Sequence, residues 1–197
     1  MASLPERLVR KSRDLSSLRA REYDHVREHF EHVDDDCLLY YEDTKHGRRF
    51  LGRYVKGALA SSEFDRYKEH LLDQVRDRES GTYIEQHDEV SRPVLARVTE
   101  EARAIPGFDL RDVSDYSYFY NRPIYPHQDS AEYRLNTLFV VKAEDVRGLL
   151  VLSLFELYFD MEEGDLLIFN ESEFHYVARN CPITRERYRL AVNFHVM

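Results

Sequence analysis

Short apolar segments separated by turn-forming residues make up the C-terminal half of this chain. About eight of these segments, between Ser114 and the last residue, read as strands. The clearest is 187–194, where two sets of side chains alternate strictly and therefore point to opposite faces of a sheet. One set is Tyr188, Leu190, Val192 and Phe194, and the other is Arg187, Arg189, Ala191 and Asn193. Eight strands in two facing sheets are typical of a jelly-roll or cupin-like barrel, the double-stranded β-helix.

The N-terminal half is patterned mainly for helices. We expect helices over Leu4 to about Val33 and over Ser61 to Arg78. The apolar side of the second helix consists of Phe64, Tyr67, Leu71 and Leu72. A third helical stretch covers Asp88 to Ala104 and is interrupted by Pro93. We expect the helices of this half to cover one sheet of the barrel.

Two further strands and one boundary complete the expected organisation. Cys37 to Tyr41 and Arg49 to Tyr54 read as strands that extend a sheet of the barrel. Pro106-Gly107 is the best boundary between a mostly helical part, residues 1–107, and a β-rich core, residues 113–197. A chain of 197 residues is long enough for one domain with a proper core. We therefore expect a single domain, mainly β with N-terminal helices, over residues 1–197.

A histidine and an aspartate lie two residues apart between two strand-like segments, 116–120 and 135–141. On a strand His127 and Asp129 point to the same side, because successive side chains alternate. A histidine from another strand, His175, would complete three ligands on one face of a metal ion. Two imidazoles and one carboxylate are the ligands of non-heme Fe(II) oxygenases, since this set leaves the opposite face open for substrates and O2.

Histidines near the N-terminus offer a rival metal site. His32 and Asp34 also form a His-x-Asp pair, but in a segment expected to be helical, where residues two apart do not share a face. His25, His29 and His32 are spaced so that they form one stripe on such a helix. No thiolate accompanies them, and an exposed polar face is the other interpretation of this stripe.

Arginines in the last strand-like segment suggest an anion site. An arginine on the inner face of a barrel requires an anion, and its planar fork can hold a carboxylate through two parallel hydrogen bonds. Arg187 is the first candidate, with Arg185 and Arg189 as competitors along the same segment. In a second interpretation, Arg187 pairs with a carboxylate of the barrel such as Asp165.

Together these residues resemble the Fe(II)/2-oxoglutarate-dependent dioxygenases, and within them the small, prolyl-hydroxylase-like branch. The resemblance covers about residues 113–197, and segment 181–188 looks much like that branch's approach to its final strand. It implies that His127, Asp129 and His175 bind Fe(II) and that Arg187 binds the distal carboxylate of 2-oxoglutarate. Tyr120 lies where a tyrosine of the family commonly shares this carboxylate.

The chain departs from the family pattern at two places. Arg189 stands where the family often has a serine or another small residue, two positions after the arginine of the clamp. The segment 121–124 replaces the branch's usual glycine-rich loop. Arg189 and Arg122, which lies in this segment, could bracket a carboxylate or phosphate of the substrate. The other interpretation of both arginines is an internal salt bridge or an exposed loop charge.

The resemblance implies an activity. An enzyme of this family consumes O2 and 2-oxoglutarate, releases succinate and CO2, and hydroxylates an unactivated C–H bond. We expect a small-molecule substrate, such as an amino acid or a related metabolite, because the inner face carries charge. Hydroxylation of a protein or peptide, as in the prolyl-hydroxylating members, is the alternative. A cupin-like metal or ligand-binding protein without enzymatic activity is the alternative from another class.

Composition narrows the possible partners and the compartment. A net charge of −9 argues against general nucleic-acid binding. Charged residues recur through the first thirty positions, so we expect no signal-peptide core there. The sequence contains no run of eighteen apolar residues, so we expect no membrane segment. Two cysteines, Cys37 and Cys181, make no disulfide framework and suit a reducing compartment. We expect a cytoplasmic protein.

Overall fold

The chain is mostly β, with two sheets and three helices among the residues that the computed structural model describes. These residues are 4–12, 22–121, 124–129, 135–143, 146–184 and 189–196. The larger sheet is mixed and has eight strands, in the spatial order β1 (Glu6–Val9), β3 (Cys37–Asp43), β4 (Gly47–Val55), β10 (Leu166–Phe169), β7 (Leu135–Lys142), β12 (Leu190–Val196), β6 (Val113–Tyr120) and β5 (Tyr83–Glu85). The smaller sheet has the order β11 (His175–Arg179), β8 (Gly148–Leu152), β9 (Leu157–Asp160) and β2 (Glu31–His32).

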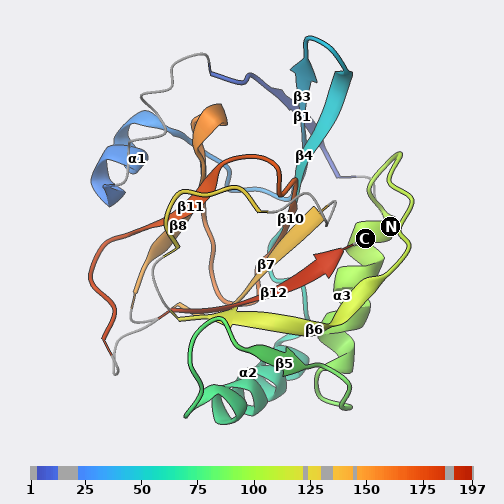
Figure 1. Ribbon diagram of the computed structural model, residues 1–197, viewed down its shortest axis with the longest axis vertical. Helices are drawn as coiled ribbons and strands as arrows, with labels where there is room; N and C mark the ends of the chain where they lie inside the picture. The colour runs from blue at the N-terminus through green and yellow to red at the C-terminus, as the bar shows by residue number, and fades with distance from the viewer. Residues whose placement is uncertain are drawn as a thin grey trace.

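Three apolar clusters fix the layers of the molecule. Val140 of the large sheet and Leu150 of the small sheet belong to the cluster between the sheets. The helices α2 (Ser61–Val75) and α3 (Arg92–Arg103) share a second cluster with the other face of the large sheet. The short helix α1 (Tyr23–His29) packs against the outer face of the small sheet. Figure 1 accordingly shows α1 beside β8 and β11, and α2 and α3 beside β5 and β6.

Several predicted elements are confirmed. Helix α2 forms where expected and buries Phe64, Tyr67 and Leu71. The two N-terminal strands form the hairpin β3–β4, and β4 pairs with β10, so the hairpin extends the large sheet. In β12 the predicted alternation also holds. Leu190, Val192 and Phe194 face the helices, whereas Ala191 faces the interior between the sheets.

The prediction of a long N-terminal helix was wrong. The segment Glu6–Val9 is instead a strand, which pairs in parallel with β3, and only Tyr23–His29 is helical. Glu31–His32 then pairs with β9. A local helical pattern predicts secondary structure only weakly, and hydrogen bonds to an available strand edge outweigh it. Residues 13–21 lie outside the described part of the chain.

Pro93 does not interrupt α3, contrary to the prediction. It lies in the first turn of that helix, where a proline is tolerated because its missing N–H would have no intrahelical partner. The residues before it form a turn in which Asp88 accepts hydrogen bonds from the N–H groups of Val90 and Ser91, at 2.8 Å each. The helix is therefore shorter than expected at its N-terminal end.

The C-terminal half has seven named strands among its described residues, β6 to β12, where about eight were expected. The segment around His127 forms only an isolated bridge to His175 rather than a full strand. The two sheets are consistent with a jelly-roll fold.

No helix in the described residues is long and apolar enough to cross a membrane. Cys37 and Cys181 are not joined in a disulfide.

Candidate metal centre

The three predicted metal ligands meet at one end of the space between the sheets. His175 begins β11, and a bridge joins its backbone to that of His127, with N–H to carbonyl distances of 3.0 and 3.1 Å. Nε2 of His127 lies 3.2 Å from one carboxylate oxygen of Asp129, and Nε2 of His175 lies 3.5 Å from the other. One potential ligand atom from each residue falls within 4.8 Å of the others.

Backbone carbonyls fix the tautomers of both histidines. Nδ1 of His127 lies 2.7 Å from the carbonyl oxygen of Tyr125, and Nδ1 of His175 lies 3.0 Å from that of Glu173. A carbonyl oxygen only accepts hydrogen bonds, so each Nδ1 carries the proton. In the neutral form of each ring the lone pair is therefore on Nε2, the atom directed at Asp129. This donor set fits a divalent metal ion with two neutral imidazoles and one carboxylate.

Asparagines orient the carboxylate ligand. Nδ2 of Asn136, on β7, donates a hydrogen bond to Asp129 at 2.7 Å. Asn193, on the neighbouring strand β12, donates in turn to Oδ1 of Asn136 at 3.4 Å. No sequence motif indicated Asn136 or Asn193. Their positions on the inward faces of β7 and β12 are the signal that could have indicated them.

The electrostatics of the cluster favour an ionised carboxylate. Burial acts to raise the pKa of Asp129, but the hydrogen bond from His127 and the neighbouring His175 outweigh it, so the pKa is lowered. The hydrogen bond to Asp129 raises the pKa of His127. Burial lowers the pKa of His175 and keeps its ring neutral. A metal ion would therefore compete with a proton mainly at His127.

Exposure differs among the three ligands. The side chain of His175 is 5% exposed, whereas those of Asp129 and His127 are 27% and 40% exposed. His175 thus lies at the bottom of the site and His127 at its rim. A metal ion held by the three side chains would be reachable from the solvent on the side of His127.

The rival histidine stripe does not form. His25 and His29 stack on each other within α1, with ring centroids 4.3 Å apart. His32 lies beyond the end of this helix, in β2, where it stacks on Tyr158. The three imidazoles do not form one stripe, because the helix ends at His29 and His32 is not part of it. Within the described part of the chain, His127, Asp129 and His175 are the group suited to a metal ion.

Arg189 directly precedes β12 and is buried. Its side chain is 5% exposed and donates a hydrogen bond of 2.7 Å to the carbonyl oxygen of Met161. None of the described carboxylates forms an ion pair with it, and burial lowers its pKa to about 10. Gly148 makes room for the side chain, because a Cβ atom there would lie 3.0 Å from Cδ of Arg189.

A second arginine, which is partly buried and which no sequence pattern indicated, lies near enough to Arg189 to act on its charge. Arg179 is on β11, four residues after His175 and therefore on the same face of that strand. Burial also lowers the pKa of Arg179 to about 10, and Arg179 in turn disfavours the charge of Arg189.

The other predicted site residues have different outcomes. Arg187, Arg185 and Arg122 lie outside the described residues. Tyr120 is half-buried on β6; burial raises its pKa, and the nearby Asp129 raises it further. Asp165, the alternative partner considered for Arg187, accepts hydrogen bonds from the hydroxyl of Tyr54 and from backbone N–H groups.

A row of aromatic rings extends from the metal centre across β6 and β5. The side chains of Tyr116, Tyr118 and Tyr120 share one face of β6, because they alternate along the strand. Tyr83 of β5 contacts Tyr118, with ring centroids 3.8 Å apart, and His195 of β12 lies 5.6 Å from Tyr118. Tyr83 and Tyr116 are 49% and 43% exposed. The row therefore leaves part of Tyr83 and of Tyr116 exposed to solvent.

Solved structures with a similar fold include 2-oxoglutarate-dependent enzymes. A prolyl-4-hydroxylase from Pseudomonas putida superposes with a TM-score of 0.56 at 15% identity, over 74% of this chain and 91% of that one. The collagen prolyl hydroxylase of Paramecium bursaria Chlorella virus-1, solved with 2-oxoglutarate, gives 0.54 at 14% identity, over 74% and 94%. This chain has the fold of the 2-oxoglutarate-dependent oxygenases.

Members of this fold group with other chemistry are also similar. The α-ketoglutarate-dependent epimerase SnoN of nogalamycin biosynthesis superposes with a TM-score of 0.52 at 14% identity, over 74% of this chain and 77% of that one. No protein-family model matches the sequence, and no curated protein matches it either. The family resemblance inferred from residues 113–197 is thus supported by the fold of the chain.

Proposed function

We propose that this protein is a non-heme Fe(II)- and 2-oxoglutarate-dependent oxygenase that hydroxylates a C–H bond of a small molecule and releases succinate and CO2. The observation that supports this most is the cluster of His127, Asp129 and His175, with both Nε2 atoms directed at the carboxylate. Two imidazoles and a carboxylate occupy one face of an iron ion and leave the other for substrates.

The protein and the iron have separate tasks in this proposal. Bound Fe(II) would supply the activation of O2 and the oxidising power for the C–H bond. Asp129 contributes the negative charge that retains the ion, and Asn136 holds its carboxylate in place. The hydrogen bonds from each Nδ1 to a carbonyl keep the two rings oriented before the metal arrives. The half-exposed His127 leaves a route for the substrate.

Arg189 becomes our first candidate for the residue that binds the distal carboxylate of 2-oxoglutarate. The sequence pattern favoured Arg187, two residues earlier, which lies outside the described residues. Arg189 is buried without a described carboxylate partner, and Arg179 adds a second positive charge nearby. Ala191, two residues after Arg189, then occupies the small position of the family pattern. With this assignment the chain has a small residue two positions after the arginine of the clamp, as the family pattern has.

The tyrosine row supports a substrate with flat or C–H-rich faces. Aromatic rings stack on planar groups and on other rings. The row begins at Tyr120, which lies near Asp129. We favour a small molecule that lies along Tyr118 and Tyr83 and reaches the metal centre with the carbon to be hydroxylated. Hydroxylation of a peptide is the second candidate, which the similarity to solved prolyl hydroxylases favours.

Anaerobic titration with Fe(II) and then 2-oxoglutarate tests the proposal. We expect one iron per chain and a weak visible charge-transfer band when 2-oxoglutarate is added. His175→Ala should lose both, because two ligands do not usually retain a labile divalent ion. His32→Ala is the control and should keep both, since His32 stacks on Tyr158 away from the cluster. A protein that binds iron but gives neither the band nor succinate would be the cupin-like binding protein instead.

A further inference from the structure

Three consecutive backbone carbonyls hold the metal-binding motif in place. The carbonyl of Glu171 accepts a hydrogen bond from the N–H of Asp129 at 3.1 Å. The carbonyl of Ser172 accepts from Nε2 of Gln128 at 2.6 Å. The carbonyl of Glu173 accepts from Nδ1 of His175 at 3.0 Å. One short loop between β10 and β11 thus orients ligands from two distant segments of the chain.

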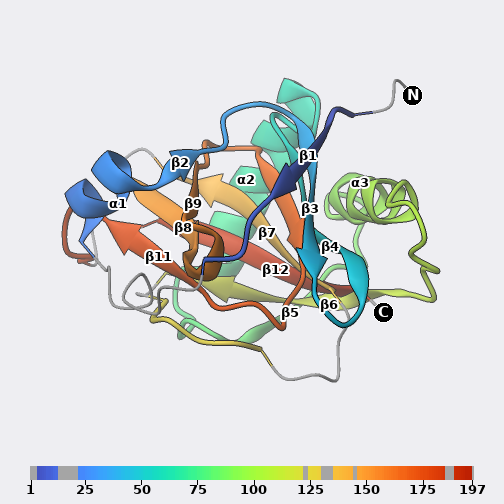
Figure 2. The same cartoon turned by 90° about the horizontal axis from the view of Figure 1, so that it is seen from above.

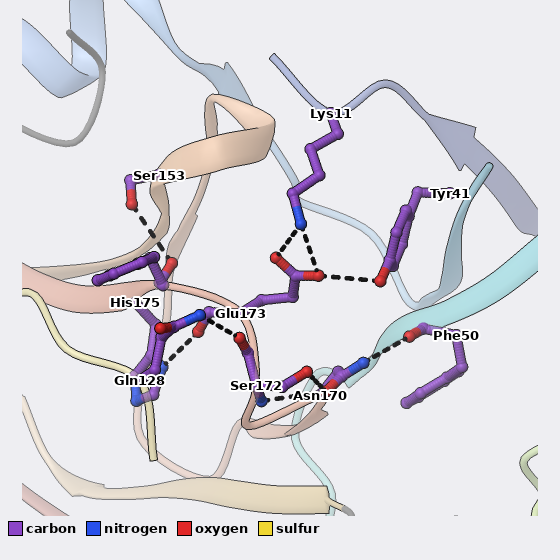
Figure 3. Close-up of polar contacts among 10 residues, drawn as sticks. Lys11, Tyr41, Phe50, Gln128, Ser153, Asn170, Ser172, Glu173 and His175 are labelled. Carbon is purple, nitrogen blue, oxygen red and sulfur yellow. Dashed lines mark hydrogen bonds and ion pairs between the residues drawn. The ribbon is translucent and has the colours of Figure 1, made fainter. Parts of the chain in front are cut away.

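This loop, residues 170–174, is itself anchored at its last turn by a buried carboxylate. Glu173 is 4% exposed, and its side chain points away from the metal centre, as Figure 3 shows. The hydroxyl of Tyr41, on β3, donates a hydrogen bond of 2.9 Å to it. A buried carboxylate needs both a charge partner and hydrogen bonds, since burial of an unpaired charge is strongly unfavourable.

The charge partner comes from the N-terminal segment. Nζ of Lys11 lies 2.7 and 2.9 Å from the two carboxylate oxygens of Glu173. The same ammonium group lies 5.5 Å from the ring centroids of both Tyr41 and Phe155. Lys11 is 162 residues from Glu173 in the sequence, so only the fold brings the two together.

The path of the N-terminal segment explains how Lys11 reaches this loop. Strand β1 runs along the edge of the large sheet, paired with β3, and the chain then crosses toward the small sheet. The N–H of Ser12 donates to the carbonyl of Leu154, which lies between β8 and β9. In Figure 2 this dark blue segment passes from β1 to the turn after β8. The segment Leu4–Ser12 is therefore a strap that joins both sheets beside the metal centre.

We infer that Lys11 and Glu173 form a positioning pair for the metal centre, through which the strap Leu4–Ser12 fixes the carbonyls that orient His175 and Asp129. This inference rests on the proposed function for the identity of the metal. Lys11 touches no ligand. It acts through the carboxylate of Glu173, and then through the main chain of residues 171–173.

The pair makes a specific prediction about metal affinity. Lys11→Met keeps the length of the side chain but leaves Glu173 buried without its cation. Loss of an outer partner of a metal ligand commonly weakens metal binding about 10- to 100-fold. We expect the dissociation constant of Co(II), used anaerobically in place of Fe(II), to rise about tenfold in Lys11→Met. Lys11→Arg, which retains the charge, should restore most of the affinity.

Arg7→Met is the matched control. Arg7 lies on the same strap and forms an ion pair with Glu31, but it contacts no part of the loop 170–174. A loss of strap stability in general would affect both variants, whereas positioning through Glu173 affects only Lys11→Met. Hydrogen exchange of the metal-free proteins gives a second measurement. The N–H of Asp129 should exchange faster in Lys11→Met than in Arg7→Met, because its acceptor is the carbonyl of Glu171.

The outcomes separate this inference from the proposed function. Wild-type protein that binds no Co(II) at the three ligands would overturn the proposed function. Wild-type binding with unchanged affinity and unchanged exchange in Lys11→Met would overturn the positioning pair alone. Should Lys11→Met fail to fold, Tyr41→Phe removes only one hydrogen bond to Glu173 and should weaken Co(II) binding by a smaller factor. Unchanged affinity in that variant also contradicts the inference.

Discussion

Gly148→Ala tests how the structure makes room for the buried arginine. Gly148 lies on β8, opposite Arg179 of β11. An added Cβ would lie 2.9 Å from Cγ1 of Val177, 3.0 Å from Cδ of Arg189 and 3.3 Å from its Nε. Carbon atoms in good contact are about 3.5–4.0 Å apart, so both neighbours have to move by roughly half an ångström or more. The arginine stem is the more flexible neighbour, and we expect its guanidinium group to shift.

The size of the effect follows from these contacts. Overpacking of a core position typically costs about 1–3 kcal/mol in the free energy of unfolding. A hydrogen bond to a charged group contributes roughly 1.5–3 kcal/mol. If the displaced guanidinium loses about half of such a bond to 2-oxoglutarate, binding weakens by about 0.8–1.5 kcal/mol, which is roughly four- to twelvefold. Metal affinity should stay unchanged, because Gly148 contacts none of the three ligands among its nearest atoms.

Calorimetric titration of 2-oxoglutarate into Co(II)-loaded protein measures this effect. Gly52→Ala is the matched control, because a Cβ there meets its nearest atom, the carbonyl oxygen of Ile168, at an ordinary 3.4 Å. Arg189→Met should weaken 2-oxoglutarate binding more than Gly148→Ala does. The reasoning is refuted if both Gly148→Ala and Arg189→Met bind 2-oxoglutarate as the wild type does. A loss confined to Arg187→Met would instead support the assignment first drawn from the sequence.

Two further predictions concern stability and pH. Glu101 is 1% exposed and pairs with Arg53, so Glu101→Gln should lower the free energy of unfolding by roughly 3–5 kcal/mol and the melting temperature by roughly 6–20 °C. Arg76→Gln, which breaks an exposed pair, should change the melting temperature little, and equal losses would contradict this reasoning. Co(II) affinity should fall as the pH falls through the pKa of His127, which the hydrogen bond to Asp129 raises above the ordinary histidine value. An affinity independent of pH between about 5 and 8 would contradict this order of protonation.

The sequence predicted the cluster of His127, Asp129 and His175 because strand alternation was expected to put His127 and Asp129 on one side. In the structure their segment forms only an isolated bridge, and this bridge to His175 brings the three side chains together. The inward face of β12 followed from the same rule. Helix α2 was predictable for a similar reason, since its apolar spacing extends over several turns.

Only the tertiary structure decided which polar residues support the site. Whether segment 4–12 is helix or strand depends on the free edge of β3, which is about thirty residues away in the sequence. Strand alternation predicted one face for Arg187 and Arg189, and the space beside Gly148 shows that Arg189 is buried, whereas Arg187 lies outside the described residues. Lys11 and Glu173 carry no signal in their own neighbourhoods. The two sheets and the strap bury the carboxylate of Glu173 away from water. A buried charge destabilises the fold unless another segment supplies its counter-charge, and here Lys11 supplies it.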